Sequence, residues 1–473
     1  MTPRKHSPLS RAILLAAACA FLPAAPLPFH PAAGFSAGGD GLQPADLDFL
    51  DAALRVCSAP LDDFSPLKIG ARGFVSTGDP GYRNTIAFLA YSLFNLHALT
   101  PAYHAPYRNC IDSLIRRMER PETTEYWRAL NLDGDPALNH NLMYRAHLSL
   151  MYGLFQFVFG DARHEESFKR VTAGIYEEVK QSPAGAVNSI PEHVFVHPLA
   201  VAMLSFFVHD SLFGTNYSDV NDAVMEWIDA NATRAGTLLL DADRDAPPCR
   251  TAPLDAIPGF SNALSIVFLD GIPDLRDHAL KMYRQFRDAF VVEADPVTYV
   301  RGSPGEGICH VSTLFGVLAA RAMGDEETFE RLSRSRNAVL ASLIEASKTQ
   351  GDAAPLTPGE PLLRVLLSSF DSFIGWHEII QRRAAQTPGQ PYLGEIAGAT
   401  SRVLDAAYVP PEKILRVRLV LERGTDLTIL NVAPGAVYET WLDETHASFS
   451  VRSETLVVPV PAGTHTLLIR FTE

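Results

Sequence analysis

Between residues 46 and 383, apolar and polar positions follow the 3.6-residue period of an α-helix. Two kinds of helix alternate in this range. One kind is apolar on nearly every side and must be buried on every side, whereas the other is amphipathic and keeps one face in water. The expected buried helices are 85–99, 142–159, 194–213, 260–269, 311–322 and 362–374, and the expected amphipathic helices are 46–57, 107–120, 165–181, 220–234, 275–291 and 326–345.

This alternation of six and six predicts a mainly α fold, an (α/α)6 barrel or toroid, with the buried helices as its inner ring. Each inner helix begins with Pro, Gly, Asn or Ser residues, which cap or preset a first helical turn. All six inner helices should therefore start at one mouth of the barrel. Polar loops on a rigid scaffold commonly carry function, so we expect the functional site at this mouth.

The hydrophobic period changes to two after a segment rich in Pro and Gly. Short alternating runs separated by turn residues predict a small C-terminal antiparallel β-sandwich module. Its expected strands are 414–421, 427–432, 437–442, 455–460 and 466–471. The expected domains are therefore a barrel at 44–385, a linker at 386–411 and the β module at 412–473.

The first residues have the pattern of an export signal. Arg4, Lys5 and Arg11 accompany an apolar run at 12–22, and small residues follow it. This predicts a signal peptide at 1–33 and a periplasmic or secreted protein, with an uncleaved membrane anchor as the alternative. No later segment has an apolar run long enough to predict a membrane span in the mature chain.

The net charge indicates which partners are unexpected, and the cysteine content limits the possible disulfide bonds. The formal net charge is −14, and no basic stripe offsets it, so nucleic acid is not an expected partner. The cysteines beyond the signal peptide are Cys57, Cys110, Cys249 and Cys309, which allow three pairings if all are bonded. Export permits disulfides.

Two histidine-containing patterns suggest chemistry at the mouth. His147 and Met143 are four residues apart on a buried helix, so they share one face, and His147 could serve as acid, base or hydrogen-bonding partner of a substrate. Glu192, His193 and His197 begin the third inner helix, with the two histidines at metal-ligand spacing. We expect pocket lining from these histidines and no metal, because a histidine pair alone is a weak zinc signature.

Two further patterns have a structural explanation beside the functional one. Cys309 and His310 begin the fifth inner helix, where a thiol could be activated, but neighbouring residues on a helix point in different directions. Asp62 and Asp63 could supply an acid from a loop, although paired aspartates are common in solvated turns.

The stretch 141–154, Asn-Leu-Met-Tyr-Arg-Ala-His-Leu-Ser-Leu-Met-Tyr-Gly-Leu, resembles the second inner helix of the bacterial linalool dehydratase/isomerase family. Segments around 86–91, 127, 190–196, 213–217 and 322–325 match that family in the same order. The resemblance covers about 86–383 and excludes the β module. It implies an exported α/α six-barrel that forms a ring-shaped homo-oligomer. It also implies dehydration and isomerisation of a tertiary allylic terpene alcohol, with no metal or organic cofactor.

The resemblance also assigns pocket positions. The family's pocket histidine falls on His147, its methionine on Met143 and its phenylalanine on Phe195, and Tyr144 lies in the same stretch as an expected substrate contact. The family's N-terminal segment carries an aspartate and a tyrosine that reach into a neighbouring subunit. This chain has no tyrosine before Tyr82 but has Asp62 and Asp63, and Asp63 is our candidate acid.

Other family positions have changed in this chain. Two pocket tyrosines fall on Phe260 and Asn84, which we still expect to contact substrate. The two family cysteines fall on Ser189 and Pro198, and the glutamate after the first falls on Ile190. Because most of the family's acid/base set is replaced, His147 with Glu192 is the pair that remains for proton transfer.

Three classes of function are compatible with these residues. The first is a lyase or isomerase acting on a small apolar alcohol or alkene, with His147, Glu192 and Asp63 as catalytic residues. The second is a barrel that binds a small ligand or a partner without turnover. The third is a metal-dependent or glycan-active hydrolase, which the scarcity of tryptophan, four in all, makes less favourable.

Overall fold

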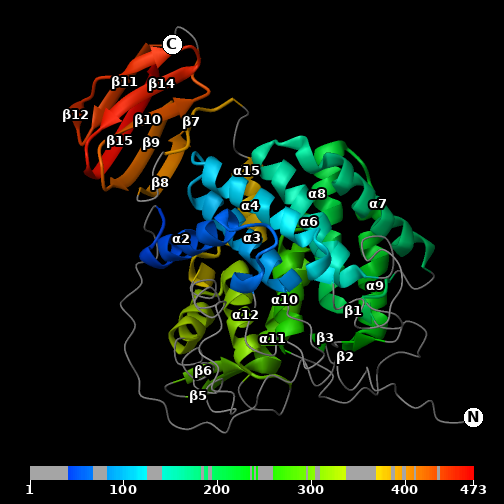
Figure 1. The fold of residues 1–473 in the computed structure, drawn as a ribbon. Helices are drawn as coiled ribbons and strands as arrows, with labels where there is room; N and C mark the ends of the chain where they lie inside the picture. Colours follow the sequence, from blue (N-terminus) through cyan, green and yellow to red (C-terminus); the bar gives the residue numbers. More distant parts are fainter. Residues whose placement is uncertain are drawn as a thin grey trace, which may run out of the picture.

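The protein consists of a helical barrel and a β-rich module beside it (Figure 1). The structure is a computed structural model. It describes residues 41–67, 82–124, 141–182, 186–189, 194–234, 237–238, 241–242, 259–294, 297–303, 309–336, 369–384, 389–396, 401–409, 412–433 and 437–472.

The expected inner ring is confirmed by five described helices that pack in sequence order. The sixth inner position, expected at 362–374, lies mostly outside the described residues. Its described end is the 3-10 turn η7 (Ser369–Ser372), which contacts both the first and the fifth inner helix and so closes the ring. The five helices are α3 (Tyr82–Leu99), α6 (Leu142–Phe159), α8 (Val196–Phe213), α10 (Gly259–Asp270) and α12 (His310–Ala322).

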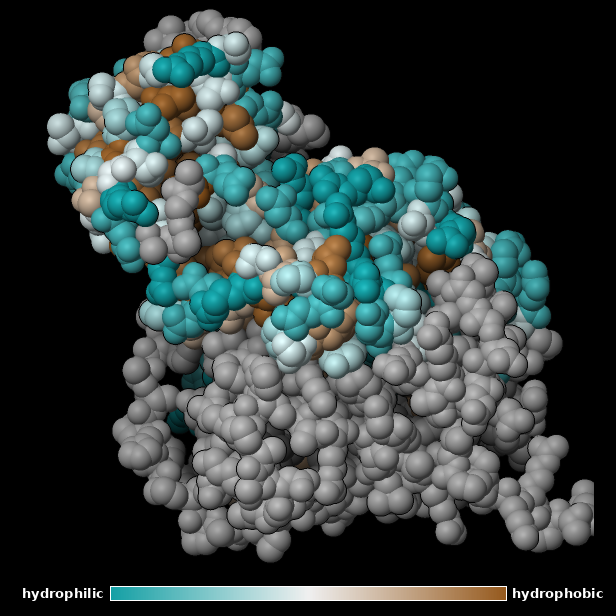
Figure 2. Space-filling view, viewed as in Figure 1, coloured by the Kyte–Doolittle hydropathy of each residue, from teal (hydrophilic) through white to brown (hydrophobic). Residues whose placement is uncertain are grey.

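The outer helices are amphipathic, as the sequence predicts. In α4 (Ala105–Met118), Tyr107, Cys110, Ile111 and Leu114 recur at helical spacing and are buried against the inner ring. Figure 2 shows hydrophilic residues over the outward surface of the barrel around α4, α6 and α7. The other outer helices with described ends are α2 (Pro44–Ser58), α7 (Glu165–Gln181), α9 (Asn221–Asn231), α11 (Arg276–Phe290) and α15 (Trp376–Ala384), and residues 326–336 are also helical.

Within the described part of the chain, α8 is long and apolar enough to cross a membrane. Its neighbours are α6 and α10, and 67% of the helix is buried inside the protein. A helix apolar on all sides is also what the centre of a barrel requires. We therefore assign α8 to the core of the barrel.

The C-terminal module is built from two antiparallel sheets that enclose one apolar core. The expected sandwich is confirmed, and residues 414–421, 437–442 and 455–460 form strands with the expected bounds. One sheet has the order β13 (Ser450–Arg452), β14 (Thr455–Val460), β10 (Thr425–Leu430), β7 (Tyr392–Leu393). The other has the order β12 (Thr445–His446), β11 (Val437–Leu442), β15 (Gly463–Thr472), β9 (Ile414–Leu421), β8 (Arg402–Val409).

The module begins earlier than the sequence predicts. β7 and β8 both fall in the expected linker at 386–411, and β8 pairs along its length with β9. In β8, buried and exposed side chains alternate at its start, where Val403 is buried between two more exposed neighbours. Short strand pairs in the barrel were not predicted either. β5 (Val291–Ala294) and β6 (Val297–Val300) form a hairpin, and β1 (Val194–Phe195) pairs with the distant β4 (Asp241–Ala242). The inner helix expected at 194–213 therefore begins at Val196.

Backbone hydrogen bonds join the module to the barrel. The amide of Ala102, just after α3, donates to the carbonyl of Ala406 at 2.9 Å, and the carbonyl of Ala102 accepts from Leu393 at 2.7 Å. The N-terminal segment also takes part, because the amide of Leu42 donates to Leu404 and Arg402 pairs with Asp51 of α2. The first described helix therefore contacts both the barrel and the module.

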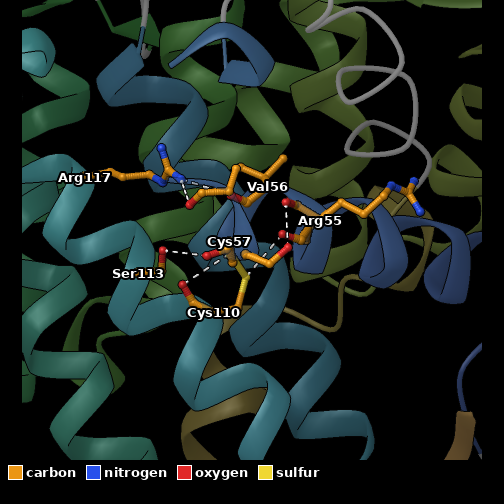
Figure 3. Close-up of a disulfide and its surroundings, with 9 residues drawn as sticks. Arg55, Val56, Cys57, Cys110, Ser113 and Arg117 are labelled. Atoms are coloured by element: carbon orange, nitrogen blue, oxygen red, sulfur yellow. Dashed lines mark hydrogen bonds between the residues drawn. A yellow bond between two sulfur atoms is a disulfide. The ribbon is translucent and has the colours of Figure 1, made fainter. Parts of the chain in front are cut away.

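A disulfide between Cys57 and Cys110 joins α2 to α4 (Figure 3). The sequence left this bond open as one of several between the four cysteines, and Cys309 is a buried thiol. The same junction carries a hydrogen bond from the Ser113 hydroxyl to the Cys57 carbonyl at 3.1 Å. Helix α2 is thereby held to the outside of the barrel by a covalent bond.

Removing this disulfide is expected to lower the free energy of unfolding. The two cysteines are 53 residues apart, and closing a loop of that length restricts the unfolded chain by about 4 kcal/mol. Urea unfolding of Cys57→Ser/Cys110→Ser measures this loss. Ser113→Ala is the control, since it removes a single neutral hydrogen bond and should cost about 1 kcal/mol. Equal losses in the two proteins would contradict the prediction.

Candidate functional site

His147 lies on the inner face of α6 and is surrounded by aromatic rings. Its Nδ1 atom is 2.8 Å from the hydroxyl of Tyr91 on α3, so the two side chains share a hydrogen bond. The rings of Phe88 and Phe268 lie 6.3 and 6.2 Å from the imidazole. Because Nδ1 is occupied by Tyr91, Nε2 is the nitrogen left for another group.

Met143 and Arg83 lie one turn closer to the starts of the inner helices. The Arg83 guanidinium donates from Nη2 to the Met143 sulfur at 2.9 Å. Arg83 is buried, whereas Met143 is partly exposed. A cation and a polarisable sulfur therefore lie on the same side of the inner ring as His147.

The third inner helix adds His197. Its Nδ1 is 3.4 Å from the Ser261 hydroxyl of α10, and its ring centroid is 6.0 Å from that of Phe260. The ring of Phe195 is nearly parallel to the imidazole, with 6.4 Å between centroids. These side chains link α8 to α10 across the inside of the barrel.

The two histidines are neutral at pH 7. Burial lowers the pKa of His147 to about 3, and His197 and Arg83 lower it by smaller amounts. Burial and Arg83 likewise lower the pKa of His197 to about 3. Burial raises the pKa of Tyr91, so its hydroxyl keeps its proton. The site therefore combines two neutral imidazoles and a phenol with one fixed cation.

Apolar rings form the rest of the described surroundings. The ring of Phe88 lies 5.3 Å from that of Phe315 on α12, so all five described inner helices contribute side chains. Tyr91 also lines a cavity of about 30 Å³, and half of the residues around this cavity are aromatic, including Phe268 and Trp376. That volume holds one or two water molecules. Such surroundings suit an apolar ligand with few polar groups.

The helices α3 and α6, which carry Tyr91 and His147, lie in a region that resembles a known protein family. Residues 83–169 match the family model described as linalool dehydratase/isomerase. The matched range contains Arg83, Tyr91, Met143 and His147 and is less than a fifth of the chain. The resemblance predicted from the sequence is therefore confirmed over α3 to the start of α7.

Solved structures similar to this chain are carbohydrate-active enzymes at low identity. The α-1,6-mannanase of Salegentibacter sp. HEL1_6 is 12% identical with a TM-score of 0.43, over 70% of this chain and 98% of that chain. A β-L-arabinofuranosidase of Geobacillus stearothermophilus T6 is 10% identical with a TM-score of 0.35, over 90% and 76%. A sugar epimerase from a ruminal bacterium is 11% identical with a TM-score of 0.35, over 61% and 86%.

The structure places the site residues expected from the sequence in different parts of the molecule. His147, Met143, Phe195, His197 and Phe260 face the inside of the barrel as described above. Asn84 lies in the first turn of α3 and is partly exposed. Glu192 and His193 lie outside the described residues.

Two expected residues make other contacts. The Tyr144 hydroxyl donates to the Met118 carbonyl of α4 at 2.9 Å, so this side chain faces the outer layer. The Asp63 carboxylate accepts from the amide and hydroxyl of Ser65, and these bonds lower its pKa. Asp63 therefore ends a surface turn. Cys309 caps α12 by accepting from the Ser312 amide.

Arg83 and Tyr91 were not selected from the sequence. Both occupy an apolar helix in which polar residues are few, and Phe88 and Tyr91 lie four and seven residues after Asn84, on the same helical face. That spacing is the signal that could have identified Tyr91. Among the described residues, no group of three His, Cys, Asp or Glu side chains could hold a metal ion.

Acid is expected to destabilise the protein because buried histidines must remain neutral. The pKa values of His147 and His197 are lowered to about 3, and burial lowers that of His104 to about 4. The unfolded chain takes up these protons near pH 6.5, so stability is present above pH 6.5 and falls as the pH drops toward 4. At pH 5 each histidine costs about 2 kcal/mol.

Buried carboxyl groups act in the opposite direction, and burial raises the pKa of both Asp46 and Asp270. Burial raises the pKa of Asp270 to about 6, so its contribution is lost as the pH rises from about 4 to 6 and offsets about 1 kcal/mol of the loss at pH 5. Urea unfolding at pH 7 and pH 5 measures the net fall. His197→Gln should reduce by about one the number of protons that the chain takes up when it unfolds at pH 5. An unfolding free energy that does not fall between pH 7 and 5 would contradict the prediction.

Proposed function

We propose that this protein is an enzyme of the linalool dehydratase/isomerase type. It catalyses acid/base dehydration or isomerisation of a small apolar alcohol, such as a terpenoid or shorter alkenol, or the reverse reaction of the alkene. The observation that carries this proposal is the hydrogen-bonded pair of His147 and Tyr91 within an inner face of aromatic rings. The family match over this region supports it.

The chemistry requires two proton transfers. Hydroxide is a poor leaving group, so an acid must protonate the departing oxygen while a base takes a proton from the neighbouring carbon. With a proton on Nδ1 donated to the Tyr91 oxygen, Nε2 of neutral His147 has a free lone pair and can act as the base. Glu192 is our candidate acid. The C–H electrons become the double bond, the C–O electrons leave with the oxygen as water, and no cofactor is needed.

The rings of Phe88, Phe260 and Phe268 hold the apolar part of the substrate in this mechanism. Aromatic faces also stabilise positive charge that develops on an allylic carbon as the C–O bond lengthens. Arg83 lowers the pKa of both histidines, so both imidazoles are neutral before the substrate binds. Each group thus has a stated part in the reaction.

We further propose that the protein acts in the periplasm or outside the cell as a ring-shaped homo-oligomer. The Cys57–Cys110 disulfide supports an oxidising compartment. A ring would give Asp63 a place in the site of a neighbouring subunit. Size-exclusion chromatography with light scattering tests the assembly, and fractionation of the expressing cell tests the compartment.

Product analysis tests the reaction. Purified full-length protein is incubated with linalool, myrcene and shorter alkenols, and products are followed by gas chromatography. We expect dehydration or isomerisation of at least one alcohol and release of one water for each alkene formed. Thermal stabilisation by these ligands with no product from any of them would overturn the enzyme proposal and favour a binding protein.

A further inference from the structure

A second cavity, of about 270 Å³, lies where the β module meets the barrel. It is lined by residues that follow α3, by the C-terminal end of α6 and by the strands around β7 and β8. Helices α3 and α6 each have 18 residues and extend about 27 Å from their starts near Arg83 and Met143. This cavity is therefore at the other end of the barrel from the candidate active site.

The charge of the cavity comes from one arginine. Arg383 lines it, and its Nε atom donates to the Phe157 carbonyl at 2.7 Å, which fixes the direction of the guanidinium. None of the described residues that line the cavity is Asp or Glu. Burial lowers the pKa of Arg383, and none of the described carboxylates raises it. A half-buried guanidinium without a carboxylate partner is costly unless an anion completes it.

Neutral hydrogen-bonding groups accompany Arg383. The Nε2 atom of Gln390 is buried and has no hydrogen-bond partner among the described residues. His104 also lines the cavity, and its Nδ1 is 3.0 Å from Nε2 of the buried His97. Burial and two arginines lower the pKa of His104 to about 4, so it is neutral at pH 7. A buried amide donor without a partner is rare, and a ligand oxygen would satisfy it.

The remaining walls are apolar and aromatic. The rings of Phe159, Tyr392 and Tyr408 line the cavity, and the Tyr392 ring meets His104 edge to face at 4.7 Å. Gly160 and Gly389 are exposed at its rim, so the cavity reaches the surface. Its volume is close to the lower end of the range for small-molecule sites.

We propose that this cavity binds a small organic acid, with the carboxylate on the Arg383 guanidinium and the apolar part against Phe159 and Tyr392. The Nη1 and Nη2 atoms form the bidentate fork that matches a carboxylate, and Gln390 Nε2 donates to the same group. The site belongs to the junction of barrel and module and is independent of catalysis in the barrel.

Isothermal titration of the full-length protein with benzoate, acetate and inorganic phosphate at constant ionic strength tests the site. We expect saturable binding of benzoate, weaker binding of acetate, and little binding of phosphate, which has no apolar part. Arg383→Gln should weaken benzoate binding at least about 10-fold. Arg382→Gln is the matched control, because the Arg382 guanidinium is exposed and pairs with Glu378.

A second variant keeps Arg383 and its bond to Phe157. Gln390→Glu has the same shape but places a negative charge in the cavity, so it should also abolish benzoate binding while the protein remains folded by circular dichroism. Benzoate binding unchanged in Gln390→Glu, or no binding of any anion to the parent protein, would overturn the proposal. Phosphate binding as tight as benzoate binding would overturn the assignment to an organic acid.

Discussion

Replacing His147 by Gln should lower turnover of the alcohol substrate at least about 100-fold and leave the fold intact. A positioned acid or base contributes typically 10²–10⁴-fold, and glutamine keeps a group that can bond to Tyr91 but cannot take up a proton. Steady-state rates by gas chromatography measure the effect. Glu192→Gln should lower turnover by a similar factor.

Two variants separate catalysis by His147 from a purely structural role. Tyr91→Phe removes only the hydroxyl that holds Nδ1, so it should lower kcat without a matching change in KM, since it alters the imidazole rather than substrate contact. His278→Gln on α11 removes a surface histidine and should leave turnover unchanged. A His147→Gln enzyme as active as the parent protein would remove His147 from the mechanism.

Replacing Arg117 by Met should lower the free energy of unfolding by about 3 kcal/mol or more. This fully buried guanidinium donates to five carbonyls at the end of α2 and in the turn after it, and Figure 3 shows it facing Val56. Each buried carbonyl that loses its donor costs about 1–3 kcal/mol, partly recovered where water can enter. The acceptors are the carbonyl oxygens of Val56, Ala59, Pro60, Leu61 and Asp63.

The adjacent arginine provides the control for this measurement. Arg116 is largely exposed and pairs with Asp112 one turn away, so Arg116→Met should change the unfolding free energy by less than about 0.5 kcal/mol. Chemical unfolding of both variants under oxidising conditions compares them with the disulfide intact. Similar losses of unfolding free energy in Arg117→Met and Arg116→Met would show that the bonds of Arg117 to the carbonyls do not stabilise the fold.

The helical part of the fold could be predicted from sequence because burial fixes its period. Helices α6 and α7 have the bounds predicted from the pattern, since the inner helix must be apolar all round and the outer one on a single face. The start of the β module could not be predicted in the same way. β8 acquires its alternation from pairing with β9, and the two-residue strand β7 is too short to show a period.

The site was only partly predictable. His147 and Met143 stood out because polar or flexible residues are rare on a buried helix. Arg83 and Tyr91 lie 60 and 56 residues away from these partners, so their pairing depends on how α3 packs against α6. Tyr144 was expected at the substrate, but a step of one residue turns a helical side chain by about 100°, and it meets α4 instead.

The contacts of α2 affect how the protein unfolds locally. This helix is bonded to α4 by the disulfide, to Arg117 through the carbonyls at its end, and to β8 through Asp51. The first described helix is therefore tied both to the barrel and to the edge strand β8 of the module, so α2 and β8 restrain one another. Amide hydrogens in α2 and β8 should accordingly exchange with solvent at similar rates, through openings that release both together.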